Sequence, residues 1–267
     1  MEKKRDAKKM ILGVIVAVAG GFCVGMTRAA GVAEGASSKD TLLLALSLIL
    51  TLLGIVIFFN GFRVSRRKVD TKLLAIAAMM AALCYIGFAL FKIDIPIPGS
   101  VEKTAFHLGN VFCVLAALLI GGLWGGLSGA VGMTIADMFT GYMTSAPKTF
   151  LLKLCIGLIT GLVAHVILKI GDETDKKKLT WKVAVSCACG MAFNVVADPL
   201  VGYFYKLYLF GIPQDIAKAL AKMSAVTTLV NAIVAVIVAT LFYLALRPAI
   251  KNMGIMKYTR HDQTPKE

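Results

Sequence analysis

The chain has 267 residues, 58% of them hydrophobic, and its mean hydropathy is +0.79. No ordinary soluble domain is this apolar, and several apolar runs approach the roughly 20 residues that a helix needs to cross a bilayer. The net charge of +14 is divided into short clusters between these runs, which argues against nucleic-acid binding and predicts an all-α, polytopic membrane helix bundle.

Eight apolar runs predict eight transmembrane helices. The first follows the basic start MEKKRDAKKM, but it is longer than the apolar part of a signal peptide and ends in no convincing cleavage site. We expect an N-terminal transmembrane hairpin of unknown role at 1–70, a six-helix domain at 71–247 and a polar cytoplasmic tail at 248–267. The expected spans are about 10–29, 41–61, 73–92, 104–121, 124–141, 147–170, 180–203 and 224–246.

Lys and Arg are distributed unevenly between alternate connections. If the N-terminus is cytoplasmic, 20 of the 29 Lys and Arg residues fall on cytoplasmic segments and the other nine on outer loops or outer helix ends. Cytoplasmic loops carry the excess of positive charge in membrane proteins. The sequence therefore predicts that both termini are cytoplasmic.

Glycines punctuate the stretch between the fourth and fifth predicted spans. Gly121, Gly125 and Gly129 fall four apart, and Gly122 and Gly126 repeat this spacing, which lets helices approach closely inside a membrane. A hairpin turn at these glycines brings the far ends of the two helices to the same side, which is the outer side in this topology. Polar residues gather at those far ends and at the start of the next span: His107, Asn110, Asp137, Tyr142, Lys148 and Lys153.

Polar residues of the last two spans follow the same rule. Asn194, Asp198 and Asn231 lie in the outer halves of their helices, whereas His165 is the main polar residue of the inner halves. Intramembrane polar groups cost free energy unless they are satisfied, so a one-sided cluster predicts a ligand pocket at the outer end of the bundle. The predicted substrate-binding residues are His107, Asn110, Asp137, Tyr142, Lys153, Asn194, Asp198 and Asn231.

Each of these residues also has a structural interpretation. His107 is suited to an interfacial cap, Lys153 can extend to the membrane surface, and asparagines can pair between helices. Two connecting segments likewise have two interpretations each. The 92–106 segment contains two prolines and either folds over the pocket or is a solvated linker, while the aromatic residues of 203–223 form an interfacial belt or stack on a ring-shaped ligand.

The sequence gives no support for a metal site, a disulfide, an ATP-binding loop or a catalytic site. The six cysteines lie inside apolar runs and have no metal-ligand spacing, so we expect neither metal, cofactor nor disulfide. There is no GxxxxGK[ST] loop, so any coupling to ATP must come from partner proteins. Asp137 and His107 can be written as an acid–base pair, but no nucleophile motif accompanies them, and we do not expect an enzyme.

Residues 71–247 resemble the substrate-binding S components of energy-coupling factor (ECF) vitamin transporters. The similarity lies in TKLLAIAAMMAALCYIGFAL, the IPIPG loop, HLGN, GGLWGGLSGAVG, APKTFLLKLCIG, NVVADPLVGYFY and LVNAIVAV, in this order. The N-terminal hairpin departs from the six-helix pattern of that family. The resemblance implies a protein of the bacterial cytoplasmic membrane that binds a vitamin with high affinity and associates with a transmembrane T component and two cytoplasmic ATPases.

The resemblance also implies a docking strip for the T component on the first helix of the six. It is matched by Ala77 and Ala81, with Ala78 and Ala82 alongside, although alanines four apart can equally serve packing within the bundle. The vitamin itself stays open among riboflavin, pyridoxine, thiamine precursors, folate, pantothenate and queuosine precursors, with a preference for a neutral flavin- or pyrimidine-like ring. The alternative functions are a stand-alone secondary transporter and a membrane scaffold without a ligand, but the inner halves lack a charged relay.

Overall fold

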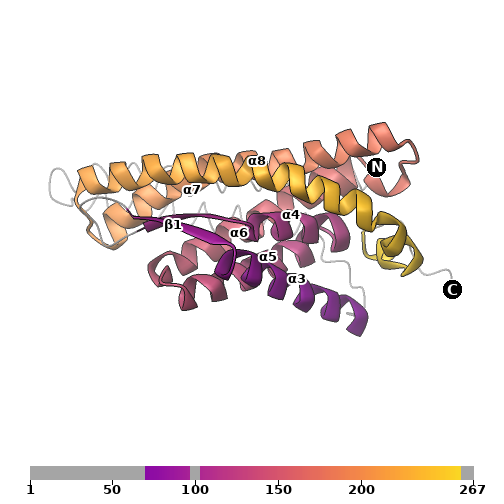
Figure 1. The fold of residues 1–267 in the computed structure, drawn as a ribbon, viewed down its shortest axis with the longest axis horizontal. Helices are drawn as coiled ribbons and strands as arrows, with labels where there is room; N and C mark the ends of the chain where they lie inside the picture. The colour runs from indigo at the N-terminus through magenta and orange to yellow at the C-terminus, as the bar shows by residue number, and fades with distance from the viewer. Residues whose placement is uncertain (1–69, 97–102, 260–267) are drawn as a thin grey trace, which may run out of the picture. The chain divides into compact units, whose positions relative to one another are not determined.

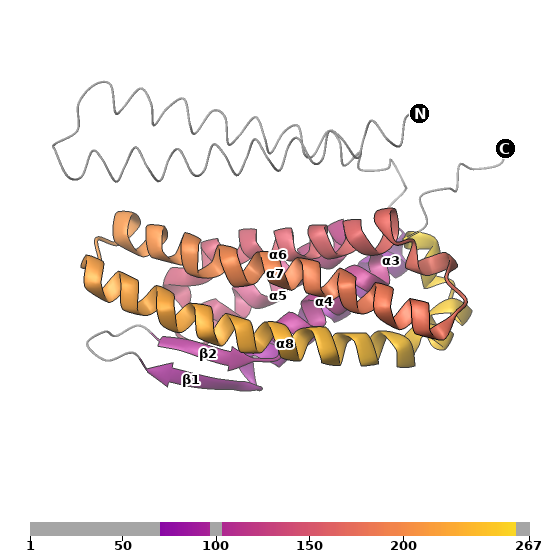
Figure 2. The same ribbon diagram turned by 90° about the horizontal axis from the view of Figure 1, so that it is seen from above.

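The computed structural model describes residues 70–96 and 103–259, and the predicted N-terminal hairpin lies outside the described residues. In this part of the chain, six α-helices and one antiparallel β-hairpin form a bundle whose long helices run side by side (Figures 1 and 2). The helices are α3 (Thr71–Ala89), α4 (Gly109–Ile120), α5 (Gly122–Phe139), α6 (Ala146–Gly161), α7 (Lys176–Leu209) and α8 (Gln214–Asn252).

The β-hairpin and four short helical turns connect these helices. The strands β1 (Lys92–Pro96) and β2 (Lys103–His107) pair in a register that places Lys92 opposite His107 and Pro96 opposite Lys103. Helix α6 continues into a π-helical turn, η2. The turns are η1 (Met143–Ser145), η2 (Leu162–Ile167), η3 (Ile170–Asp172) and η4 (Ile255–Tyr258).

The predicted all-α, multi-pass bundle is confirmed. Within the described residues, four segments are long and apolar enough to cross a membrane: Thr71–Ala89, Met143–Ile167, Lys176–Tyr208 and Gln214–Asn252. The 12-residue helix α4 is shorter but also apolar, and it contacts α3, α5, α6 and α8. It is therefore the central helix of the bundle.

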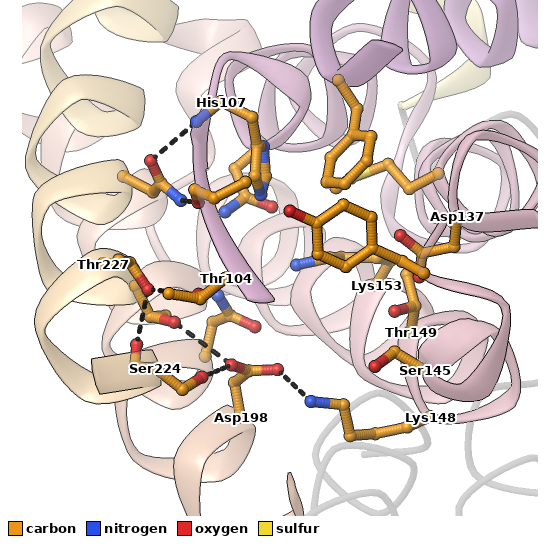
Figure 3. A pocket seen from close by; sticks show the side chains of 18 of the residues that line it. Thr104, His107, Asp137, Ser145, Lys148, Thr149, Lys153, Asp198, Ser224 and Thr227 are labelled. Carbon is orange, nitrogen blue, oxygen red and sulfur yellow. Dashed lines mark hydrogen bonds and ion pairs between the residues drawn. The ribbon is translucent and has the colours of Figure 1, made fainter. Parts of the chain in front are cut away.

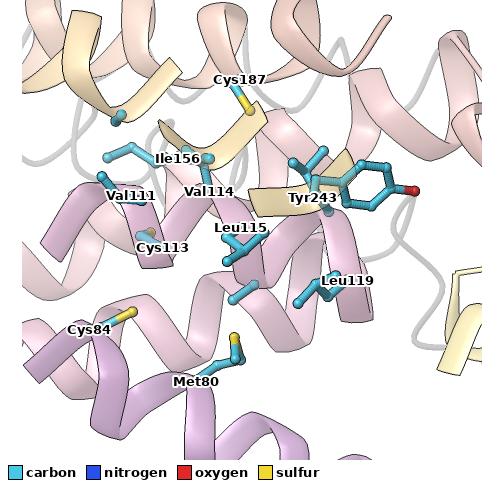
Figure 4. Packing of buried hydrophobic residues seen from close by; sticks show 14 of the residues in the cluster. Met80, Cys84, Val111, Cys113, Val114, Leu115, Leu119, Ile156, Cys187 and Tyr243 are labelled. Carbon is cyan, nitrogen blue, oxygen red and sulfur yellow. The ribbon is translucent and has the colours of Figure 1, made fainter. Parts of the chain in front are cut away.

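Side chains from α4 fill the core between the surrounding helices (Figure 4). Eleven of its 12 residues are buried, and only Phe112 is partly accessible. Val114 and Leu115 pack with Ile156 of α6 and with Tyr243 of α8 in the same cluster. An apolar helix surrounded on all sides needs no amphipathic pattern, which explains why its sequence is hydrophobic in every direction.

Glycines allow α5 to lie unusually close to α6. A Cβ atom added at Gly157 would overlap the backbone of Gly126, and one at Gly161 would overlap the backbone of Gly122. Each helix thus presents two glycines four residues apart to the other. The spacing noted in the sequence is used for backbone contact, as small residues are in membrane helix pairs.

The chain turns between α4 and α5 at a single residue, Gly121, whose φ of +88° is in the region that favours glycine. The observed turn is therefore shorter than the predicted turn over 121–126, and α5 begins at Gly122. Because the turn is so short, α5 returns directly along α4. The two helices then deliver Asn110 and Asp137 to the same end of the bundle.

The 203–223 segment is helical rather than a connection, contrary to the sequence interpretation. Only residues 210–213 separate α7 from α8, and Gly211 there has a φ of +62°. At 1.5 Å per residue the 34 and 39 residues of these helices span about 50 and 60 Å, more than the ~30 Å of a bilayer core. Their polar ends therefore continue beyond the apolar region, where hydropathy no longer marks a helix.

The C-terminal region is ordered further than the tail prediction allowed. Helix α8 continues past Pro248, and η4 folds back with Ile255 buried in the core cluster. The Tyr258 hydroxyl donates to Asp70 Oδ2 at 2.6 Å, and Lys72 Nζ donates to the Met253 carbonyl at 2.5 Å. These contacts attach the C-terminal segment to the start of α3.

Replacing Gly157 with alanine is expected to destabilise the bundle. The added methyl group would meet the Gly126 backbone, which cannot rotate away as a side chain can, and overpacking of this kind costs about 1–3 kcal/mol. Thermal unfolding in detergent should show a lower midpoint for Gly157→Ala. The control Cys189→Ala changes an exposed residue of α7 and should leave the midpoint unchanged. Equal midpoints for both variants would contradict the glycine contact.

Candidate functional site

A polar cavity opens at the end of the bundle that carries the β-hairpin (Figure 3). Its interior volume is about 100 Å³, and the space counted together with the open mouth is about 680 Å³. Side chains from β2 and from all six helices line it. The structure brings all eight predicted substrate-binding residues to this cavity: His107, Asn110, Asp137, Tyr142, Lys153, Asn194, Asp198 and Asn231. That they bind a ligand stays a prediction.

Several polar atoms of the cavity are buried without a protein partner. They are Asn110 Oδ1, both amide atoms of Asn194, Asp137 Oδ2 and His107 Nδ1. Asn110 and Asn194 are each only 1% exposed. A buried polar group without a hydrogen bond costs about 1–3 kcal/mol, so a cluster of them in one cavity indicates groups that a ligand satisfies.

Asp198 joins three helices at the cavity wall. Its Oδ1 accepts from Lys148 Nζ of α6 at 2.8 Å, and its Oδ2 accepts from Ser224 Oγ at 2.5 Å and Thr228 Oγ1 at 3.2 Å, both of α8. Both carboxylate oxygens therefore have protein partners (Figure 3). This arrangement positions α6, α7 and α8 around the cavity, whatever further contact Asp198 makes with a ligand.

Asn231 also has its side chain engaged by protein. Its Oδ1 accepts from the His107 backbone N–H at 3.0 Å, and its Nδ2 donates to the Ala105 carbonyl at 3.1 Å. Next to it, the Thr104 and Thr227 hydroxyls share a hydrogen bond of 2.8 Å. The amide thus binds the open edge of β2 as a neighbouring strand would, and its observed role is to hold the hairpin on α8.

The hairpin is held on its other side by an ionic cluster. Asp94 Oδ2 accepts from Lys103 Nζ at 2.6 Å and Lys92 Nζ at 3.0 Å, and its Oδ1 accepts from the Tyr142 hydroxyl at 2.8 Å. Partial burial raises the pKa of Asp94, but the hydrogen bonds from Lys103, Tyr142 and Lys92 outweigh this and lower it to about 2. Asp94 is therefore ionised at neutral pH.

The described part of the 92–106 segment does lie over the cavity, as the first of its two interpretations held. Lys103, Thr104 and Ala105 line the cavity wall from β2. Tyr142 stands edge-on to Phe88, with ring centroids 5.5 Å apart, and Phe88 in turn contacts the His107 ring at 4.6 Å. Strand pairing could not be foreseen because the two prolines and Gly99 indicated an irregular path.

Sequence reasoning missed the hydroxyl residues of α8. Ser224, Thr227, Thr228 and Asn231 follow one another at i, i+3, i+4 and i+7, so they share one face of the helix, and that face lines the cavity. All four positions lie inside the expected span 224–246, so the pattern was readable from the sequence. The other polar lining residues outside the predicted set are Lys103, Thr104, Ser145, Lys148, Thr149 and Lys206.

The aromatic residues near the end of α7 contact one another rather than the cavity. The Phe204 and Tyr208 rings are stacked with centroids 6.0 Å apart, and Tyr203 meets Phe204 edge-on at 5.2 Å. None of these three is among the lining residues of the described cavity. Their placement agrees with the interfacial interpretation and not with stacking on a ligand inside the pocket.

The alanine strip of α3 divides into two faces. Ala77 is buried, with its carbonyl accepting from Ser128 Oγ of α5 at 2.9 Å, and the Ala81 carbonyl lies where Gly132 has no side chain. Ala78 and Ala82 are exposed. Of the four alanines predicted for docking, the first pair therefore packs within the bundle, and the second pair is accessible to a partner.

The fold and cavity define a class: multi-pass membrane proteins with a polar cavity at one end of a six-helix bundle. The family of the ECF-type riboflavin transporter, S component, matches residues 68–248, more than half of the chain, and the chain belongs to this family. Neither the curated proteins nor the solved structures gave a match. The family is one of transporter components and not of enzymes, and the predicted S-component resemblance is confirmed.

Loss of the Asn231 amide is expected to loosen the β-hairpin. Asn231→Leu keeps an apolar volume but leaves the His107 N–H and the Ala105 carbonyl unpaired, at about 1–3 kcal/mol each. Hydrogen exchange of the β2 amides should accelerate by at least about tenfold. The matched variant Asn252→Leu, on an exposed part of α8, should leave β2 protected. Unchanged β2 protection in Asn231→Leu would argue against the anchor.

Proposed function

We propose that this chain captures riboflavin from outside the bacterial cytoplasmic membrane and delivers it with the help of a T component and two cytoplasmic ATPases. Membership of the family supports vitamin uptake as the function. The observation that carries the substrate assignment is the set of buried, unpartnered polar atoms facing one cavity. The excess of Lys and Arg on alternate connections supports cytoplasmic termini, and with them a cavity open to the outside.

Asn194 is the residue best suited to identify the ring. Its amide offers a donor group and an acceptor, and both atoms lack a protein partner although Asn194 is only 1% exposed. The pyrimidine-type end of the riboflavin ring alternates carbonyl, N–H and carbonyl groups. A carboxamide can therefore form two parallel hydrogen bonds with this edge, which an alkyl or phenyl group would not satisfy.

The remaining unpartnered acceptors suit the rest of the vitamin. Asp137 Oδ2 and Asn110 Oδ1 can accept hydrogen bonds from the hydroxyl groups of the ribityl chain. Thr149 and Ser145 add hydroxyls beside Asp137 on the same wall (Figure 3). Phe88, Tyr142 and Met133 supply apolar surface for a planar ring. The cavity thus combines flat apolar contact with a few placed polar groups, as small-molecule sites do.

Docking of the T component is proposed for the exposed face of α3. Ala78 and Ala82 lie four residues apart and are both exposed, beside Leu74 and Met79, which are 53% and 63% exposed. Small residues at this spacing let a second helix approach closely in lipid. The sequence contains no GxxxxGK[ST] loop, so in this proposal the energy of ATP hydrolysis for transport comes through such a partner. Dependence of uptake on the partner ATPases separates this proposal from a stand-alone secondary transporter.

Removing the Asn194 amide is expected to weaken riboflavin binding. Asn194→Leu loses two hydrogen bonds of about 0.5–1.5 kcal/mol each, so the dissociation constant should rise about 10- to 100-fold. Quenching of riboflavin fluorescence during titration with purified protein measures this constant. Cys189→Leu, on the exposed side of α7, is the control and should bind normally. Normal affinity in Asn194→Leu would refute the ring assignment.

Enlarging the exposed alanines should separate binding from transport. Ala78→Leu combined with Ala82→Leu leaves the bundle interior unchanged, so riboflavin affinity should persist while uptake and co-purification with the T component are lost. Ala77→Leu with Ala81→Leu is the comparison, because these side chains face α5 and the change should lower the thermal midpoint. Co-purification of the Ala78/Ala82 variant at the normal level would exclude this face as the docking site.

A further inference from the structure

Positive charge exceeds negative charge in the lining of the cavity. Four lysines and two aspartates face it, and the neighbouring Asp94 is already paired with Lys92 and Lys103. Lys148 pairs with Asp198 at 2.8 Å. The six lining residues with formal charge are Lys103, Lys148, Lys153, Lys206, Asp137 and Asp198.

Lys153, like the buried Asp137, is a member of this set that forms no ion pair within 4.0 Å among the described residues. It is 6% exposed, and within the described residues no carboxylate lies within 4.0 Å of its ammonium group. The hydrogen bond between Lys153 and Cys113 involves the backbone carbonyl of Lys153, which accepts from Cys113 Sγ at 3.7 Å, and not its ammonium group. The side chain therefore presents its amino group to the cavity without a contacting counter-ion, and the carboxylates of Asp137 and Asp198 belong to the same lining (Figure 3).

The position of Lys153 is at the inner part of the cavity. It is one turn further into the bundle along α6 than Thr149, just as Asn194 is one turn further along α7 than Asp198. Both residues line the same cavity. A ring whose pyrimidine-type end is held by Asn194 would therefore bring that end to the inner part of the cavity that Lys153 also lines.

A buried ammonium group without a counter-ion is costly, and the cost falls when a ligand supplies negative charge at that place. Oxidised riboflavin is neutral and supplies none. Two-electron reduction adds two electrons and one proton to the ring. The proton is taken up at N5, and the resulting single negative charge is shared between N1 and the C2 carbonyl, which belong to the pyrimidine-type end.

We propose that the cavity binds the reduced, anionic form of its flavin more tightly than the oxidised, neutral form, with Lys153 as the residue that discriminates between them. This inference rests on the proposed function, because it concerns the same ligand in the same cavity. Binding then favours reduction. If the reduced form binds about tenfold more tightly, the two-electron midpoint potential of bound flavin rises by about 30 mV relative to free flavin.

The experiment uses the purified full-length chain in detergent with riboflavin. Binding of the oxidised vitamin is measured first, by fluorescence quenching. The bound flavin is then reduced stepwise with dithionite, which supplies the electrons, in the absence of oxygen and with mediator dyes, and the ring absorbance gives the midpoint potential. We expect an upward shift of at least about 30 mV against free riboflavin in the same buffer.

Two substitutions assign the effect to Lys153. Lys153→Met keeps an unbranched side chain without charge. It should abolish most of the shift in midpoint potential, and it should weaken binding of reduced riboflavin more than binding of oxidised riboflavin. Lys222→Met removes an exposed lysine of α8 outside the cavity lining and should retain the full shift. Lys153→Gln provides a second neutral variant in case Lys153→Met does not fold.

The outcomes separate this inference from the function on which it rests. A bound flavin with the potential of free riboflavin, or a lower one, would overturn the inference and leave riboflavin binding intact. A full shift that persists in the neutral Lys153 variants would overturn the assignment to Lys153. Failure of the wild-type chain to bind riboflavin in either oxidation state would refute the proposed function, and the inference with it.

Discussion

The contact of α5 with α6 through paired glycines is the constraint on which the described bundle depends. Gly122 and Gly126 meet Gly161 and Gly157 backbone to backbone, so no side chain separates these helices. Because α4 returns into α5 at Gly121, the close contact also fixes α4 against both. The polar ends of three helices are then held at one end of the bundle, where they form the cavity.

The cavity concentrates most of the buried polar residues in the described part of the bundle. Its surrounding core is apolar, with a central helix buried on almost every side. Such a scaffold tolerates the free-energy cost of burying polar atoms of Asn110, Asn194 and Asp137 that have no protein partner. It also keeps these side chains oriented in the absence of a ligand. Preorganised, dry polar groups bind tightly because little ordering remains to be done when the ligand arrives.

The wall of the cavity is assembled from parts that perform different tasks. Asp198 links α6, α7 and α8, and Asn231 attaches the β-hairpin to α8. Asp94 attaches the same hairpin to Tyr142 on the opposite side. These contacts position the other residues that face the cavity. A polar residue lining the site is therefore not by itself a ligand contact, and the network of hydrogen bonds separates the two roles.

The sequence by itself determined the membrane bundle, the six-helix part and eight of the residues that line the cavity, because hydrophobic runs, charge distribution and one-sided polar residues are local properties of the chain. Only the tertiary structure decided that Asn231 binds the backbone of β2, that Ala77 and Ala81 face α5, and that 203–223 is largely helical. Hydrogen-bond partners and helix faces depend on contacts between distant segments, and spacing along one helix cannot reveal which neighbour each face will meet.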